Sequence, residues 1–275
     1  MTAVPLVDAQ PGDLVHLAGL VDAASMSRGG DPGLVWAEYR SVIENAITNQ
    51  PRSMQKRIGP SELGTDCLRC LARKLAGQQA TQEAAWLPTV GTAVHAWLEE
   101  QFMLYNHQAG TTRFLVETRV SVGEVAGVDI TGSVDLYDLA TAEVTDWKIC
   151  GATTLRTAKA NGPSNTYRKQ GHLYGRGLTR RGLPVDRVRI AYLPRNATSL
   201  DHAVIWSEPF DEQVALDTLN RANALMKAVN AVGIDALLST LEAAPGCFDC
   251  PRFDPTAPKP GREHQPRTLA GLLAG

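Results

Sequence analysis

Two aspartates and a lysine, Asp135, Asp146 and Lys148, stand in the runs GSVD and TDWK, within neighbouring segments that resemble β-strands. Hydrolysis of a phosphodiester needs a divalent cation that polarises the phosphate and lowers the pKa of the attacking water. Hard cations such as Mg²⁺ or Mn²⁺ take oxygen ligands, so two aspartates on adjacent strands are suitable material. Because side chains alternate along a strand, Asp146 and Lys148 should project from one face, where the lysine can orient or deprotonate the water.

A simpler explanation treats Asp135 as a turn residue and Asp146 with Lys148 as a solvated pair at a strand edge. The surroundings argue against it, because both acids lie in otherwise apolar strands. A carboxylate near a core costs free energy unless its charge is compensated, and a metal ion compensates it. The pattern therefore favours a metal site.

Four of the five cysteines form two C-x-x-C pairs, Cys67 with Cys70 and Cys247 with Cys250. This spacing lets two thiolates reach one metal ion or cluster, and both pairs together would tie the two ends of the chain. Tetrahedral Zn²⁺ and a cubane iron–sulfur cluster both fit, and the spacing alone favours zinc. Cys150 has no pair, and we expect it to be buried as a small hydrophobe.

The elements that position these residues follow from hydrophobic periodicity. We expect a helix from Pro88 to Tyr105, a polar loop over 151–165, a helix from Thr166 to Arg181, and helical structure over 211–241 with a break near Gly233. Strands are expected at 113–122, 127–138, 142–149, 187–195 and 202–210. This order predicts an α/β fold in which a mixed central β-sheet is wrapped by helices at both ends.

Four motifs resemble, in order, the pattern of the PD-(D/E)XK (restriction-endonuclease-like) nuclease superfamily in its RecB-like branch. That branch includes the CRISPR-associated "Cas four" exonucleases, the AddB-type recombination nucleases and phage relatives. The resemblance covers roughly residues 58–253, and Asp146 stands where glutamate is commoner. The motifs are His95 in GTAVHAWLEE, Asp135 in GSVD, Asp146 and Lys148 in DWK, and Gln170 with Tyr174 in QGHLY.

The resemblance implies a role for each of these positions. Lys148 would be the catalytic lysine, Gln170 and Tyr174 would contact DNA or brace the site, and Glu99 and Glu143 are candidate partners of the ligands. The implied ligands of Mg²⁺ or Mn²⁺ are His95, Asp135, Asp146 and the backbone carbonyl of Ile149. On residue type alone, His95 beside an apolar stripe is more often a packing residue, and Gln170 with Tyr174 is an ordinary i, i+4 pair.

Basic residues beside Gln170 are candidate DNA contacts. Arg168 and Lys169 would bind the phosphate backbone, while Tyr167 or Tyr174 would stack on bases. The simpler interpretation of such charges is a solvated helix face.

The same resemblance bears on the cysteines. Several RecB-like nucleases hold a 4Fe–4S cluster with one early and three late cysteines, which bracket the nuclease domain. Here the split is two and two, but the location matches. The resemblance therefore favours a 4Fe–4S cluster at Cys67, Cys70, Cys247 and Cys250, with Zn²⁺ as the alternative.

Composition limits the class of protein. The chain has 275 residues and a formal net charge of −2, which argues against non-specific coating of DNA but not against catalysis on it, because a nuclease needs only a local basic track. The sequence holds no stretch of about twenty apolar residues, so we expect no transmembrane helix. Its N-terminus lacks a basic region before an apolar run, so we expect no secretory signal and a cytoplasmic location.

We expect three parts: a helical accessory segment at 1–57, a RecB-like nuclease domain with the metal clamp at 58–253, and a Pro-rich basic tail at 254–275. The expected function is that of a metal-dependent DNA exonuclease acting on single strands or ends in recombination, repair or processing, with a helicase, recombinase or integrase as partner. The alternative is a catalytically silent or complex-dependent DNA-binding adaptor with a nuclease fold. A zinc-stapled transcription regulator would leave the acids unexplained.

Overall fold

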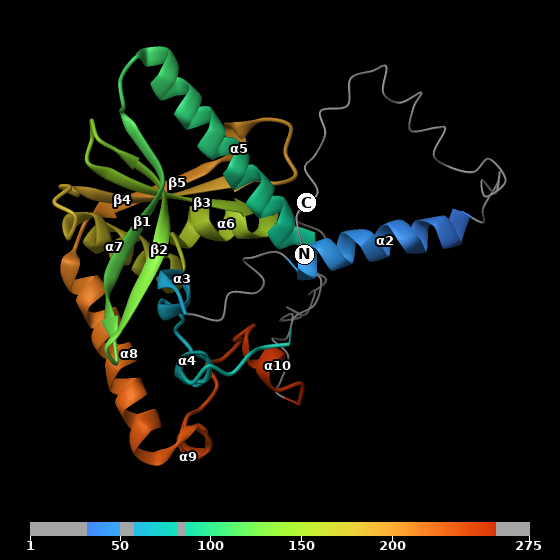
Figure 1. The fold of residues 1–275 in the computed structure, drawn as a ribbon, viewed down its shortest axis with the longest axis vertical. Coiled ribbons are helices and arrows are strands. Elements are labelled where there is room, and N and C mark those ends of the chain that lie inside the picture. The colour runs from blue at the N-terminus through green and yellow to red at the C-terminus, as the bar shows by residue number, and fades with distance from the viewer. Residues whose placement is uncertain (1–31, 50–57, 82–85, 257–275) are drawn as a thin grey trace, which may run out of the picture.

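A five-stranded mixed β-sheet forms the centre of the protein (Figure 1). The computed structural model describes residues 32–49, 58–81 and 86–256. Neighbouring strands are antiparallel except β3 and β4, which run parallel. In spatial order the strands are β1 (Phe114–Val125), β2 (Val128–Asp138), β3 (Glu143–Cys150), β4 (Arg187–Pro194) and β5 (Val204–Pro209). The expected mixed sheet is confirmed.

Helices precede the sheet, cross over between β3 and β4, and follow β5. Before the sheet lie α2 (Pro32–Thr48), α3 (Pro60–Leu63), α4 (Leu68–Leu75) and α5 (Trp86–Ala109). The crossover holds α6 (Ala152–Asn161) and α7 (Asn165–Thr179), and a short 3₁₀ helix at Leu200–His202 precedes β5. After the sheet lie α8 (Glu212–Val232), α9 (Ile234–Thr240) and α10 (Cys250–Phe253). The expected break at Gly233 is present, with φ +80° at that glycine.

The segment after β3 differs from its prediction. Residues 151–165 were expected to form a polar loop, but Ala152–Asn161 is the helix α6. Leu155 and Ala158 are buried and pack with Ile190 and Tyr192 of β4. Gly162, with φ +74°, ends the helix. Packing of these two apolar residues, three positions apart, stabilises the short helix against the sheet. The polar threonines around them made the helical spacing of apolar residues hard to recognise in the sequence.

Glycines allow α7 to pack closely against its neighbours. A Cβ at Gly177 would lie 2.5 Å from Cγ2 of Val120 in β1, and one at Gly175 would lie 2.6 Å from the ring of Phe210. Glycine within a helix costs about 1 kcal/mol relative to alanine. The close approach offsets that cost by burying α7 in the core, which places Gln170 of α7 beside β3.

β2 and β3 pair along only part of their length. The paired residues run from Asp138–Glu143 to Leu136–Thr145, and no pairing continues beyond Leu136 and Thr145. β3 meanwhile stays paired with β4 as far as Cys150. The sheet is therefore open on one side of β3, from Asp146 onward.

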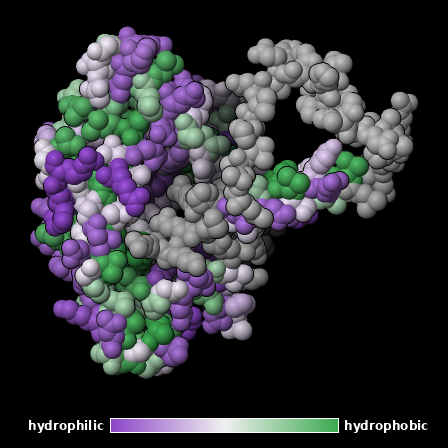
Figure 2. Space-filling view, viewed as in Figure 1, coloured by the Kyte–Doolittle hydropathy of each residue, from purple (hydrophilic) through white to green (hydrophobic). Residues whose placement is uncertain are grey.

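The part of the chain before the sheet includes the exposed helix α2. Trp36, Tyr39, Val42 and Ile43 are exposed on it, and Figure 2 shows apolar side chains along this helix where it extends from the body. Residues 1–31 and 257–275, which belong to the expected accessory segment and tail, lie outside the described residues. Among the described helices, none combines the length and apolar character that crossing a membrane requires.

Candidate active site

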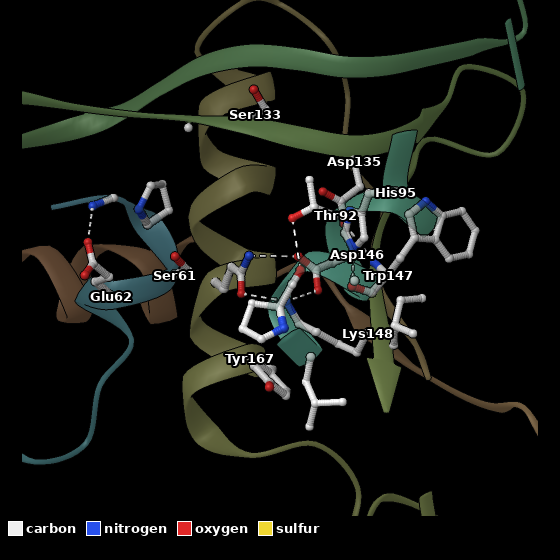
Figure 3. A pocket seen from close by; sticks show the side chains of 18 of the residues that line it. Ser61, Glu62, Thr92, His95, Ser133, Asp135, Asp146, Trp147, Lys148 and Tyr167 are labelled. Carbon is white, nitrogen blue, oxygen red and sulfur yellow. Dashed lines mark hydrogen bonds and ion pairs between the residues drawn. The ribbon is translucent and has the colours of Figure 1, made fainter. Parts of the chain in front are cut away.

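A cavity of about 920 Å³ opens where β2 and β3 separate. It is lined by residues of α2, α3, α4, α5, β1, β2, β3, α6, α7, β4 and α10. Figure 3 shows His95, Asp135, Asp146 and Lys148 gathered on one wall, with Ser61 and Glu62 of α3 standing apart from them. The expected site residues that line the cavity are His95, Asp135, Asp146, Lys148, Ile149, Gln170 and Tyr174.

Asp146 and Lys148 project from the same face of β3 and meet at short range. Nζ of Lys148 lies 2.6 Å from Oδ2 of Asp146 and donates a hydrogen bond to Oε1 of Gln170 at 3.1 Å. Nε2 of Gln170 donates to Oδ1 of Asp146 at 2.8 Å. The amide therefore ties the carboxylate to the ammonium. This contact explains why a glutamine on α7 belongs with the acid–lysine pair of β3.

Burial sets the protonation of this pair. The Asp146 side chain is 2% exposed, and its burial raises the pKa of the carboxyl to about 6, although the Lys148 ammonium opposes the shift. Burial lowers the pKa of Lys148, but the charge of Asp146 outweighs it, so the pKa lies above its usual value. Nζ of Lys148 also lies 4.5 Å from the centre of the Tyr167 ring, a cation–π contact. Lys148 is therefore held as an ammonium at the cavity wall.

His95 and Asp135 face each other across the opening. Nε2 of His95 lies 3.1 Å from the carbonyl oxygen of Trp147, so in the neutral ring this nitrogen carries the proton and donates it. Nδ1 then turns its lone pair toward Oδ2 of Asp135, 3.6 Å away. Burial lowers the pKa of His95, but the Asp135 carboxylate outweighs it and the pKa is raised. Two acceptor atoms facing each other need a cation or a proton between them.

Glu117 joins this pair and was missed by the sequence analysis. In β1, Val116 pairs with Leu136 and Thr118 with Val134, so Glu117 stands opposite Asp135. Its carboxylate, the Asp135 carboxylate and a ring nitrogen of His95 lie within 4.8 Å of one another. Glu117 has φ +42°, a conformation that side-chain-bearing residues rarely adopt and that is often retained at functional sites. The sequence would have indicated Glu117 only if the pairing register of β1 with β2 had been known.

These donors fit a divalent cation. One imidazole and three carboxylates line the opening, which is the oxygen-rich set that Mg²⁺ and Mn²⁺ take. Oδ2 of Asp146 is buried and has the Lys148 ammonium close by, but no hydrogen bond of suitable geometry. The Lys148 ammonium compensates the charge of this oxygen, which still has acceptor capacity that a divalent cation would use. Ile149, whose carbonyl was expected to be a ligand, also lines the cavity.

The other expected site residues lie elsewhere. Arg168 is paired with Glu208 and Lys169 with Asp66, each at 2.5 Å, and neither lines the cavity. Glu143 pairs with Arg187 and Arg189 of β4, at the opposite end of β3 from the site. Glu99, one helical turn beyond His95, is not among the residues that line the cavity.

The cavity has its own basic residues, which the sequence analysis did not select. They are Lys74 of α4, Arg195 just beyond β4, and Arg252 of α10. The backbone N–H of Arg195 donates to the carbonyl of Cys150 at 2.8 Å, and this hydrogen bond holds the backbone of Arg195 beside the end of β3. A cationic side chain in a cavity lined by carboxylates is suited to a phosphate diester.

The four cysteines of the two C-x-x-C motifs meet where α4 and α10 come together. Cys67 is the residue before α4, Cys70 lies in its first turn, and Cys250 begins α10. Their sulfurs and that of Cys247 all lie within 4.8 Å of one another. The structure therefore gathers the four residues into one group that can bind metal. Cys150 is buried apart from them, packed with Leu155 and Tyr192.

Comparison with known proteins gives no family assignment. No protein-family model matches the chain, and no curated protein matches it. Solved structures that are similar to parts of this one include an alkaline exonuclease from Laribacter hongkongensis, 15% identical, with a TM-score of 0.44 over 67% of this chain and 93% of that one. A putative exonuclease from Eubacterium rectale is 16% identical, with a TM-score of 0.42 over 87% and 98% of the two chains. A phage-related exonuclease from Haemophilus somnus is 15% identical, with a TM-score of 0.41 over 67% and 96%. At this level, likeness carries no inference about activity, which must come from the side chains.

Proposed function

We propose that this protein is a metal-dependent DNA nuclease of the PD-(D/E)XK type. The supporting observation is the convergence of His95, Glu117, Asp135 and Asp146 beside the half-buried Lys148, on one wall of an open cavity. Burying this many ionisable groups is costly, and a structural role would not need them to surround a gap. Residues 58–253 form the proposed nuclease unit.

Each residue has a proposed role. His95, Glu117, Asp135 and Asp146 would hold one or two divalent ions, with the Ile149 carbonyl as a further ligand. A bound Mg²⁺ or Mn²⁺ supplies Lewis acidity toward the phosphate and lowers the pKa of a water molecule. Lys148, held by Asp146 and Gln170, presents its ammonium to the water and to the charge that develops on the phosphate. Gln170 acts as a positioning residue, since it is 5% exposed and bonds to Asp146.

The proposed substrate is DNA, which the cavity would bind at a free end or as a single strand. Arg195 is exposed on the cavity rim and suited to phosphates, and Tyr167 offers a ring beside Lys148 on which a base can stack. Exonuclease action in recombination, repair or DNA processing is the biological setting that we propose. A helicase, recombinase or integrase would deliver the strand.

A cleavage assay with a matched control tests the function. Purified protein is incubated with end-labelled single-stranded and duplex DNA in Mn²⁺ or Mg²⁺, beside D146A and D129A. Asp129 is exposed on the same strand as Asp135 and bonds to Ser121, away from the cavity. We expect wild type and D129A to release nucleotides and D146A to lose at least about a thousandfold in rate, because the charge stabilisation that a metal ion supplies is worth several kcal/mol. Equal cleavage by D146A contradicts the site. DNA binding without cleavage by wild type, in every metal tried, supports the adaptor alternative.

A further inference from the structure

The four cysteine sulfurs are spaced as a single tetrahedral ion requires. Sγ of Cys70 lies 3.3 Å from that of Cys250 and 3.7 Å from that of Cys247. Sγ of Cys67 lies 3.7 Å from that of Cys250. At a Zn–S distance of about 2.3 Å, tetrahedral geometry sets the sulfurs about 3.8 Å apart. These separations are well above the bonded distance of a disulfide, which is about 2.05 Å.

The same spacing does not fit an iron–sulfur cubane. In a 4Fe–4S cluster each thiolate binds a different iron at its own corner, which puts the sulfurs about 6 Å apart. All four sulfurs here lie within 4.8 Å of one another. A two-iron cluster also holds its two pairs of thiolates on opposite sides, farther apart than this. The gap between the four sulfurs accommodates one ion.

We propose that Cys67, Cys70, Cys247 and Cys250 bind one structural zinc ion, in place of the 4Fe–4S cluster that the resemblance to RecB-like nucleases favours. Thiolates select soft or borderline metals, and four of them close the coordination sphere of Zn²⁺, which leaves no position for a substrate. The site is enclosed: Cys70 is fully buried, and Cys67 and Cys250 are 3% and 7% exposed. The backbone N–H of Ala244 points at Sγ of Cys67, 3.4 Å away, where it stabilises a thiolate.

The zinc ion would fasten two segments that form one wall of the cavity. Lys74 of α4 and Arg252 and Phe253 of α10 line the cavity. Other contacts bridge the segments: Lys74 pairs with Asp249 at 2.7 Å, and the N–H of Thr81 donates to the carbonyl of Arg252 at 2.8 Å. Cys70 and Cys247 are 177 positions apart, so the ion closes a long loop in the unfolded chain.

Metal analysis of the full chain tests this proposal, whether or not the chain cleaves DNA. The protein is expressed with iron and zinc both supplied and purified without oxygen, so that a labile cluster would survive. We expect about one zinc and less than about a tenth of an iron per chain, as a closed Cys₄ site requires. About four irons per chain with a brown colour would overturn the proposal, as would one iron per chain or no metal at all.

Two variants and a spectroscopic probe sharpen the test. Cys247 is only partly buried, so C247S should fold, and we expect it to lose most of its zinc and to melt roughly 5 °C or more lower. C150S is the control, because Cys150 lies outside the group and should leave zinc content unchanged. Protein refilled with Co²⁺ should show the intense visible bands of a tetrahedral thiolate site, and C247S should lose them. Weak octahedral bands in the wild-type chain, or full zinc retention by C247S, would contradict the assignment.

Discussion

Oδ2 of Asp135 accepts a hydrogen bond from the backbone N–H of Trp147 at 2.8 Å, across the gap where β2 and β3 separate. In a continuous sheet that N–H would be paired with a backbone carbonyl. The aspartate therefore has a structural task beside its proposed role as a metal ligand. It replaces a missing bond of the sheet at the place where the cavity opens.

Substitution can separate these two tasks of Asp135. In D135N the amide oxygen still accepts from Trp147, so we expect an unfolding free energy close to that of the wild type. D135A leaves a part-buried N–H without its acceptor and should be about 1–3 kcal/mol less stable. Both variants should lose DNA cleavage, because neither has the carboxylate. Denaturant titration and the cleavage assay measure the two effects, and a D135A protein as stable as D135N would contradict the structural task.

Glu117 should be needed for metal affinity and should carry backbone strain. We expect E117A and E117G to require at least about tenfold more Mn²⁺ for half-maximal cleavage, because each removes one carboxylate ligand. Glycine adopts φ +42° without the clash that a Cβ causes, so E117G should be more stable than E117A by about 1 kcal/mol.

Glu124 provides the control for Glu117, because it lies on the same strand with an exposed side chain. E124A should leave the metal requirement unchanged. If E117A responds to Mn²⁺ as the wild type does, Glu117 is not part of the metal site.

Local sequence patterns predicted those parts of the site that depend on one strand. Alternation along β3 placed Asp146 and Lys148 on one face, and the structure brings them to 2.6 Å. Glu117 could not be found in this way. Its position beside Asp135 depends on how β1 pairs with β2, and its position near His95 depends on how α5 packs. The strands were predictable for the same reason that Asp146 was: period-2 alternation is local.

The other parts of the site depend on contacts between residues that are distant in the chain, which local sequence patterns do not predict. Arg168 and Lys169 look like phosphate contacts in the sequence, but Glu208 and Asp66, which are distant in the chain, neutralise them in the fold. The C-x-x-C spacing is compatible with both zinc and a cluster, and the proposal of zinc rests on the distances between sulfurs of the two pairs, which depend on the fold.

The DNA track can be located by comparing Arg195 with Lys169. Arg195 lies on the cavity and Lys169 is paired with Asp66 outside it. We expect R195A to bind single-stranded DNA about threefold to tenfold more weakly and to reduce the slope of log affinity against log salt by about 0.7, as loss of one phosphate contact to a single strand does. K169A should change this slope less. If K169A has the larger effect, DNA follows the outer surface of α7 instead of the cavity rim.

His172 should make the protein less stable in mild acid. It is fully buried, its Nδ1 accepts the backbone N–H of Asp211 at 3.2 Å, and Nε2 therefore donates to Glu208 at 2.6 Å. Burial lowers the pKa of His172, an effect that the neighbouring Glu208 carboxylate opposes and the Arg168 charge reinforces. An unfolded histidine has a pKa of about 6.5. Below that pH the unfolded chain binds a proton that the folded chain resists, so the stabilising effect of neutral His172 is present above pH 6.5 and is lost as the pH falls toward the folded pKa.

Comparison of pH profiles isolates this group. The unfolding free energy of wild type should fall from pH 7.5 to pH 5.5 with a slope of up to about 1.4 kcal/mol per pH unit more than that of H172Q, which cannot take up the proton. His95 has a raised pKa and acts with the opposite sign, but it is present in both proteins and cancels in the difference. H202Q, at an exposed histidine, is the control and should follow the wild type. Parallel profiles for wild type and H172Q would mean that His172 takes up its proton at the same pH in the folded and unfolded chains, contrary to its neutral, doubly bonded state in the structure.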